Sequence, residues 1–258
     1  MGLKKELFEK SLFLHQIVAK RSGGKVKFVP DYLEGKVHTQ PMAYDAVAKS
    51  EFNNYNQFYD YVRFRTIELI AEEIYRNNVE GDIVEAGVDY GDCSTVINAV
   101  FKDRKMFLYD TFSGFDKRDV EVEEKNSYTS DSFFKSANYF KRESFKSPEE
   151  QMEYVRKRLR YPENATFRKG YFPETAEGEK ERKFAFVSLD MDLYQPIKSG
   201  IEFFYPRLSK GGYIMIHDYN HEEFKGIKDA VAETEAIYGP FAKMPIPDQG
   251  GTIVIMKP

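Results

Sequence analysis

The chain alternates short apolar runs with longer amphipathic stretches. The apolar runs have the length of buried strands, whereas the longer stretches repeat apolar residues every three or four positions, as helices do. The predicted strands are 82–86, 105–109, 165–169, 184–189, 213–216 and 252–256. The predicted helices are 55–77, 94–101, 148–161, 196–208 and 224–238. This alternation predicts an α/β fold with a doubly wound, mostly parallel sheet, and the turn at 248–251 predicts a closing antiparallel hairpin.

Two parts of the chain lack this alternation. Residues 1–20 have helical spacing and residues 21–50 carry the glycines and prolines of a connecting loop. Residues 112–147 mix aromatic and charged residues without a period. We therefore divide the chain into an N-terminal helical and loop segment, 1–54, and a domain, 55–258, with the insertion 112–147. The first helix either covers the active site, contacts a second subunit in a homo-oligomer, or packs on its own domain. The insertion either covers the acceptor substrate or is an inert addition.

The domain is organised around the stretch 81–95, which predicts a strand, a glycine turn and a helix. Gly87 and Gly91 lie where the chain must turn tightly and a ligand approaches the backbone. Ser94 lies at the start of the helix, where free N–H groups point back at the turn. The spacing E-x-G-x-x-x-G differs from that of dinucleotide sites. Glu85 would repel a pyrophosphate and suits an ammonium group or sugar hydroxyls, although the stretch could also be an ordinary turn.

The amino-acid composition limits the kinds of partner and the cellular compartment that we expect. The 258 residues include 38 basic and 42 acidic side chains, a net charge of -4, so nothing favours nucleic acid or an anionic membrane. Cys93 is the single cysteine, which excludes an internal disulfide and favours a reducing compartment. The first residues lack the apolar core of a signal peptide, and no run has the length of a membrane span. We expect a cytoplasmic protein.

Polar residues lie at the ends of four of the predicted strands, the first of which carries Glu85. Asp110 ends the second strand, where a nucleotide-binding fold holds ribose hydroxyls, and with Glu85 nearby we favour that role. The alternative is a helix cap or a residue of the turn 110–114. The remaining polar residues follow the fourth and fifth strands, and they are Asp190, Asp192, His217, Asp218 and His221. Because parallel strands direct their carboxyl ends at one crevice, these groups could share a divalent ion. The alternatives are a helix cap for Asp192 and a satisfied strand-end histidine for His217.

Four motifs resemble one known family. They are E-A-G-V at 85–88 with Gly91, Y-D-T-F-S-G-F at 109–115, L-D-M-D-L-Y at 189–194 and H-D-Y at 217–219. The chain from about residue 55 onwards resembles the macrocin O-methyltransferases (TylF-like), which methylate sugar hydroxyls on natural products with S-adenosylmethionine. The resemblance implies a seven-stranded class I methyltransferase sheet and a magnesium ion.

The resemblance also implies roles for individual residues. Those expected to bind S-adenosylmethionine are Glu85, Gly87, Gly91 and Asp110, to which we add the neighbouring Ser94, Thr111 and Asp190. Asp190 and Asp218 would bind the metal, with Asp192 as the general base. The family has an aspartate where this chain has His217, and some members place a catalytic histidine near Asn220 and His221. His217 could therefore be a third ligand that favours Mn²⁺ over Mg²⁺, and the base could be His221.

The sequence thus predicts an O-methyltransferase that acts, with a divalent metal, on a sugar hydroxyl of a small molecule. The acceptor would be a natural product, a nucleotide-linked sugar or a cell-surface glycan precursor. One alternative is an NAD-dependent oxidoreductase, which would need a pyrophosphate loop. Another is a non-catalytic S-adenosylmethionine-binding partner in a biosynthetic cluster, which the histidine at position 217 would permit.

Overall fold

The computed structural model describes residues 28–31, 36–39, 61–130, 145–248 and 250–258. The chain forms two compact units, Met1–Tyr61 and Val62–Pro258. The predicted first helix, residues 1–20, lies outside the described residues, as does the part of the insertion from 131 to 144. No helix among the described residues combines the length and apolar character needed to cross a membrane.

The prediction of a loop over residues 21–50 is wrong for eight of them. Strands β1 (Phe28–Asp31) and β2 (Lys36–Thr39) form an antiparallel pair in which Pro30 lies opposite Val37. Proline lacks an N–H and is tolerated in a strand that pairs on one side only. The proline was therefore misleading as a sign of a loop.

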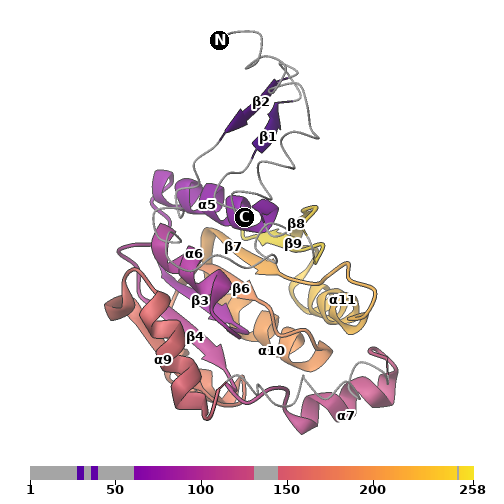
Figure 1. Cartoon of the computed structure of the whole chain (residues 1–258). Helices are drawn as coiled ribbons and strands as arrows, with labels where there is room; N and C mark the ends of the chain where they lie inside the picture. Colours follow the sequence, from indigo (N-terminus) through magenta and orange to yellow (C-terminus); the bar gives the residue numbers. More distant parts are fainter. Residues whose placement is uncertain (1–27, 32–35, 40–60, 131–144, 249) are drawn as a thin grey trace. The chain divides into compact units, whose positions relative to one another are not determined.

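The second unit contains a seven-stranded sheet with the order β5-β4-β3-β6-β7-β9-β8 (Figure 1). Its strands are β3 (Asp82–Ala86), β4 (Met106–Asp110), β5 (Ala165–Lys169), β6 (Phe184–Leu189), β7 (Leu208–Ile216), β8 (Ala242–Pro245) and β9 (Ile253–Met256). The first five are parallel to one another, and β9 is antiparallel to both β7 and β8. The predicted mostly parallel sheet with a closing antiparallel hairpin is confirmed.

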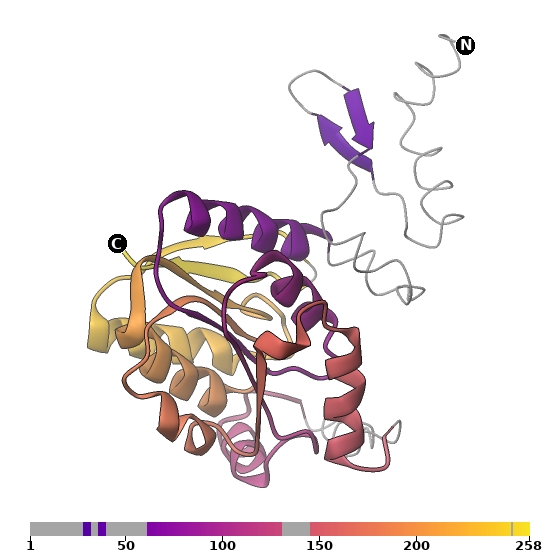
Figure 2. The ribbon, with the colours of Figure 1, turned by 90° about the vertical axis from the view of Figure 1, so that its left-hand side faces the viewer.

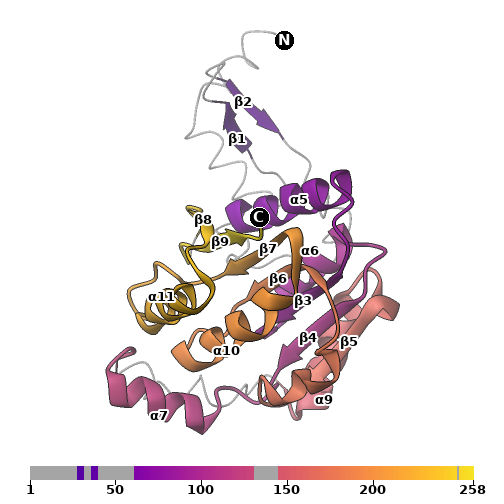
Figure 3. The ribbon, with the colours of Figure 1, turned by 180° about the vertical axis from the view of Figure 1, so that it is seen from behind.

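Helices cover both faces of this sheet (Figures 1, 2 and 3). The side of α5 (Tyr61–Arg76) also carries α6 (Asp92–Val100) and α9 (Pro148–Arg158). The opposite side carries α10 (Tyr194–Phe204) and α11 (Gly226–Tyr238), and α7 (Lys117–Asn126) contacts α10. Short 3₁₀ turns, η1 (Pro162–Asn164), η2 (Glu174–Glu179) and η3 (Tyr205–Arg207), connect these elements.

Two elements differ from the pattern in the sequence. Helix α7 occupies part of the insertion that showed no period, because its sequence KRDVEVEEKN offers almost no apolar stripe. Strand β7 begins at Leu208, five residues before the predicted start, and so includes Gly211 and Gly212. A Cβ on Gly212 would lie 2.9 Å from the Ala185 carbonyl oxygen, so this strand passes its neighbour too closely for a side chain.

The chain reverses direction across the sheet between β3 and β6. From β3 the strands proceed outward through β4 to β5, and the chain then returns to pair β6 with the other edge of β3. The crevice at such a reversal, beyond the carboxyl ends of the strands, is where doubly wound sheets bind ligands.

Candidate active site

Strand ends bring one row of residues together across the sheet. The register makes neighbours of the residues that follow the paired ends of β4, β3, β6 and β7. In that order, the row is Asp110, Gly87, Asp190 and His217. The Asp190 N–H donates to the Ala86 carbonyl at 2.8 Å, and the His217 N–H donates to the Leu189 carbonyl at 2.9 Å. The sheet's own pairing therefore brings the predicted residues into one crevice.

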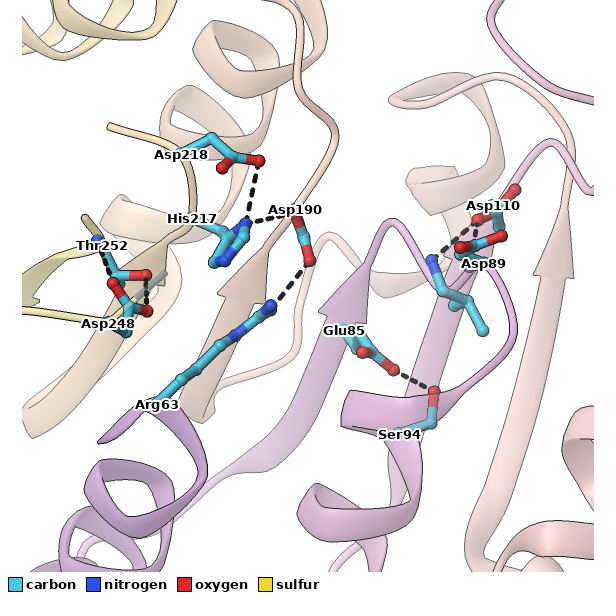
Figure 4. A network of polar contacts seen from close by, with 11 residues as sticks. Arg63, Glu85, Asp89, Ser94, Asp110, Asp190, His217, Asp218, Asp248 and Thr252 are labelled. Carbon is cyan, nitrogen blue, oxygen red and sulfur yellow. Dashed lines mark hydrogen bonds and ion pairs between the residues drawn. The ribbon is translucent and has the colours of Figure 1, made fainter. Parts of the chain in front are cut away.

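Asp190 lies at the centre of a charged cluster (Figure 4). Its Oδ2 is 2.9 Å from Arg63 Nη2, and its Oδ1 is 3.1 Å from His217 Nδ1. The same nitrogen lies 2.9 Å from Asp218 Oδ2. Arg63 comes from α5, far from the others in sequence, and its side chain is only 5% exposed. The cluster therefore alternates positive and negative groups.

The charges in this cluster shift one another's pKa. Burial opposes a charge on His217, but the negative charge of Asp190 outweighs it and raises the pKa of His217 to about 10. Burial also opposes a charge on Asp190, yet His217 and Arg63 lower the pKa of its carboxyl below the ordinary range. Both side chains are therefore charged at neutral pH when no other cation is bound.

The residues present fit a divalent cation. Asp190, His217 and Asp218 each offer a ligand atom, and these atoms lie within 4.8 Å of one another. The two nitrogens of His217 are buried and have no well-aligned hydrogen bond among the described residues. Two carboxylates with one imidazole form a donor set for Mn²⁺ or Mg²⁺, although the imidazole must first lose its proton.

The loop between β8 and β9 packs directly against the cluster. A Cβ on Gly250 would lie 2.5 Å from Asp218 Oδ1 and 2.6 Å from His217 Nε2. Asp248 accepts hydrogen bonds from the Thr252 N–H and hydroxyl, at 2.7 and 2.5 Å (Figure 4). A side chain at position 250 would therefore have to displace the predicted ligands.

Asp192 lies beside this cluster and lines the cavity in the crevice. Its backbone has φ 62, a left-handed conformation that aspartate tolerates better than most residues. Burial and the nearby charges of Asp190 and Asp218 raise the pKa of its carboxyl. A carboxylate with a raised pKa is a stronger base than an ordinary aspartate.

His221, the other candidate base, lies elsewhere. Its side chain is exposed, its Nδ1 accepts the Glu223 N–H at 3.2 Å, and its ring packs near Phe224. It is absent from the described lining of the cavity. The geometry therefore favours Asp192 as the residue that meets a substrate.

Glu85 is fully buried under the crevice. Successive strand residues face opposite sides, so Glu85 points toward α6 while Val84 and Ala86 belong to the core on the other face. Ser94 of α6 donates to its Oε2, and Oε1 has no hydrogen-bond partner among the described residues (Figure 4). Burial raises the pKa of Glu85 to about 8. Neither Glu85 nor Ser94 lines the described cavity. The structure therefore shows a hydrogen bond between these two side chains, beneath the cavity.

The carboxylate of Asp110 stabilises the glycine turn. Its Oδ2 accepts the N–H groups of Val88 and Asp89 at 2.7 and 3.1 Å, and its Oδ1 accepts the Phe112 N–H at 2.7 Å. Thr111 donates its hydroxyl to the Gly114 carbonyl at 2.5 Å. Both residues also line the cavity, so the structural role and the predicted ligand role are compatible.

Neither glycine of the turn has room for a side chain. Gly87 has φ 89, and a Cβ there would lie 1.8 Å from the Asp190 carbonyl oxygen. Gly91 has φ 76, and a Cβ there would meet Val155 of α9 at 2.7 Å. Gln151, also on α9, donates to the Asp89 carbonyl at 2.9 Å. The turn is therefore enclosed by α9 and the β6 end.

Three residues of the site carried little signal in the sequence. Arg63 lies four positions before Ile67 on the buried face of α5, and a charge on an apolar stripe could have marked it. Asp119 and Gln151 line the cavity but lie on helices whose apolar pattern is weak. Their positions depend on tertiary packing, which the sequence pattern does not encode.

Comparison with known proteins gives three relatives with similar sequence identity to this chain. The 8-demethyl-8-(2,3-dimethoxy-alpha-L-rhamnosyl)-tetracenomycin-C 4'-O-methyltransferase of Streptomyces olivaceus is 26% identical over 210 residues, which cover 76% of this chain and 72% of that protein. The demethyldecarbamoylnovobiocin O-methyltransferase of Streptomyces niveus is 29% identical over 183 residues, covering 67% and 65%. The mycinamicin III 3''-O-methyltransferase of Micromonospora griseorubida is 25% identical over 191 residues, covering 67% and 72%.

Solved structures share the fold. The O-methyltransferase NovP superposes with a TM-score of 0.59 at 23% identity, covering 80% of this chain and 83% of NovP. The calicheamicin methyltransferase CalS11 superposes with a TM-score of 0.57 at 16% identity, covering 89% and 95%.

A model of the macrocin-O-methyltransferase (TylF) family matches residues 57–245, which include the glycine turn, every parallel strand and the charged cluster. Since this match spans well over half of the 258 residues and the sheet agrees with it, the chain belongs to the macrocin-O-methyltransferase (TylF) family of S-adenosylmethionine-dependent O-methyltransferases.

Proposed function

We propose that this enzyme transfers the methyl group of S-adenosylmethionine to a hydroxyl of a sugar carried by a natural product or by a nucleotide. The observation that carries the proposal is the cavity that extends from the glycine turn to Asp192 and Asp190. It supplies a binding surface for the methyl donor and a base at its end. The relatives' names support the acceptor class, since one names a rhamnosyl group and two specify primed hydroxyl positions.

The charge of the cavity supports a cationic donor. S-adenosylmethionine carries a sulfonium and an ammonium group, both of which are stabilised by carboxylates. The described lining contains no lysine or arginine, and its acidic residues are Asp89, Asp110, Asp116, Asp119, Asp190 and Asp192. A pyrophosphate would be repelled there, so an NAD-dependent oxidoreductase is not favoured. A non-catalytic partner is not favoured either, because the cavity contains Asp192, a carboxylate that would serve as the base.

The cofactor residues would act through their backbone as much as their side chains. Gly87, Asp110 and Thr111 line the cavity and would contact the donor directly. The Asp110 carboxylate would accept hydrogen bonds from the ribose hydroxyls in addition to those it accepts from backbone N–H groups. Glu85, Ser94 and Gly91 would act beneath or behind the turn by keeping its conformation fixed. Methyl transfer is an in-line displacement, so rigid positioning of the donor is the main requirement.

Asp192 would accept the proton. The O–H bond of the sugar hydroxyl breaks as its proton moves to the Asp192 carboxylate, and the oxygen forms a bond to the methyl carbon. The bond from that carbon to sulfur breaks, and its electron pair stays on sulfur, which leaves neutral S-adenosylhomocysteine. The raised pKa of Asp192 favours this step because it makes the carboxylate a stronger base than an ordinary aspartate.

Asp190, Asp218 and His217 would hold a divalent metal, with manganese preferred because of the imidazole. When bound, such an ion orients acceptor oxygens and lowers the pKa of a hydroxyl. Arg63 would fix the direction of the Asp190 carboxylate. Gly250, which has no side chain, would leave His217 and Asp218 in place.

A donor-labelling experiment tests the proposed function. The enzyme is incubated with S-adenosylmethionine carrying a deuterated methyl group and with a panel of nucleotide-linked deoxysugars and rhamnosylated glycosides. The expected result is a mass increase of one labelled methyl on the sugar of at least one acceptor, with release of S-adenosylhomocysteine. Labelling confined to the aglycone or to a nitrogen would overturn the sugar hydroxyl as the acceptor.

A further inference from the structure

One carboxylate in the cavity has an oxygen that no described residue uses. Asp119 lies in the first turn of α7, is 5% exposed and lines the cavity beside Gly114, Phe115 and Tyr171. The Tyr171 hydroxyl donates to its Oδ1 at 2.8 Å. Its Oδ2 has no hydrogen-bond partner among the described residues, yet that atom is not sealed from the cavity. A buried carboxylate with one open oxygen needs a donor.

The neighbouring carboxylates are already used. Both oxygens of Asp116 accept from the Arg118 guanidinium, at 2.9 and 3.0 Å. Both oxygens of Asp110 accept backbone N–H groups. Arg118 also stacks its guanidinium 3.6 Å from the centre of the Tyr171 ring, which fixes the tyrosine that holds Asp119. Asp119 thus differs from Asp110 and Asp116 in having a carboxylate oxygen without a hydrogen-bond partner among the described residues.

The surroundings of Asp119 suit a flat aromatic base. The loops after β4 and β5 contribute aromatic rings and glycines to the lining, and these are Gly114, Phe115, Gly170, Tyr171 and Phe172. The reacting end of the donor must lie near Asp192, which follows β6. The nucleoside end must therefore extend over β3 toward β4 and β5, where these rings lie.

We propose that Asp119, oriented by Tyr171, accepts a hydrogen bond from the exocyclic amino group of the donor's adenine and so selects adenine over a base with a keto oxygen there. This inference rests on the proposed methyl donor. A carboxylate can only accept hydrogen bonds, so it attracts the amino group and repels a keto oxygen. Burial raises the pKa of Asp119 to about 6, which leaves the group ionised at neutral pH.

The test compares S-adenosylhomocysteine with its deaminated analogue S-inosylhomocysteine, in which a keto oxygen replaces the exocyclic amino group and N1 carries a proton. Calorimetry gives the dissociation constant of each for the wild type, Asp119→Asn and Tyr171→Phe. We expect the wild type to prefer the adenine compound by roughly 10- to 100-fold, because a charged hydrogen bond is lost with the analogue. Asp119→Asn should reduce the preference to about 3-fold or less, since an amide donates to a keto oxygen as readily as it accepts. Tyr171→Phe should reduce it partly.

Glu121→Gln is the matched control, because it removes the charge of an exposed carboxylate on the same helix that is absent from the described lining of the cavity. It should retain the full preference. Equal weakening of both compounds by Asp119→Asn, or an unchanged preference in a variant with normal thermal unfolding, would overturn the assignment of Asp119. A wild type that binds neither compound would instead overturn the proposed donor, and the inference with it.

Discussion

Arg63 Nη2 lies 2.9 Å from Asp190 Oδ2, although 127 residues separate the two in sequence. The contact crosses from the start of α5 to the end of β6. It occupies one oxygen of Asp190 and directs the other toward His217. A helix that precedes the sheet in sequence therefore determines how the central carboxylate of the site is presented.

Replacing Arg63 by methionine should lower turnover and stability together. Removing one partner of a buried ion pair leaves the other uncompensated, which costs about 3–5 kcal/mol. Arg63→Lys keeps the charge and should restore part of the turnover. Denaturant unfolding and steady-state kinetics measure the two effects. Arg76→Met, on the same helix but in an exposed i,i+3 pair with Glu73, is the control and should cost about 1 kcal/mol or less. Equal turnover in Arg63→Met and wild type would show that Asp190 needs no such support.

The buried Glu85 should make stability fall as pH rises. Its pKa is raised from 4.5 to about 8, so the unfolded chain releases its proton at lower pH than the folded chain does. The free energy of unfolding therefore decreases between these values as pH rises. Glu85→Gln should unfold at higher temperature than the wild type at about pH 9 and at nearly the same temperature at about pH 4.5. The exposed Glu80→Gln is the control; a Glu85→Gln variant that is less stable at the higher pH would contradict the buried neutral state.

Glu123 of α7 should affect catalysis through the segment that carries Asp192. Its Oε1 accepts the N–H of Tyr194, the first residue of α10, at 2.6 Å, and its Oε2 accepts the Thr129 hydroxyl at 2.7 Å. Loss of a helix cap costs about 0.5–2 kcal/mol. Glu123→Ala should lower turnover while the affinity for S-adenosylhomocysteine stays unchanged, and Glu123→Gln should restore much of it. The exposed Glu121→Ala should behave as the wild type. A parallel loss of cofactor affinity would instead mean that α7 supports the whole cavity.

Much of this site follows from the sequence because strand ends are easy to locate. An apolar run closed by an acid is enough to place Asp110 and Asp190 at one edge of the sheet. Which way Glu85 points did not follow, because alternation places it opposite Val84 but does not say which face carries the cavity. Arg63 and α7 were missed for a related reason: their roles come from packing against distant segments. The predicted roles of the remaining site residues stay predictions until binding and turnover are measured.

The metal prediction depends on His217, which lies in the cluster with its Nδ1 beside two carboxylates. Chelation by EDTA should abolish turnover, and Mn²⁺ should restore it better than Mg²⁺ because an imidazole is a poor ligand for magnesium. His217→Asp should shift the preference toward Mg²⁺, whereas the exposed His221→Asp should leave it unchanged. Activity assays with each ion, and calorimetric metal affinities of the variants, measure both effects. Full activity of the metal-stripped enzyme would exclude a metal from the reaction.

The most direct test of the account is the product formed by wild type and Asp192→Asn from S-adenosylmethionine carrying a ¹³C methyl group. Asparagine keeps the shape of Asp192 and removes its basicity. We predict that the wild type yields a methoxy carbon coupled to a sugar ring proton in the NMR spectrum. Asp192→Asn should form the same product about 10²–10⁴ times more slowly, with unchanged affinity for S-adenosylhomocysteine. A methyl group on any atom other than a sugar oxygen, or an equal rate in the two proteins, would contradict the account.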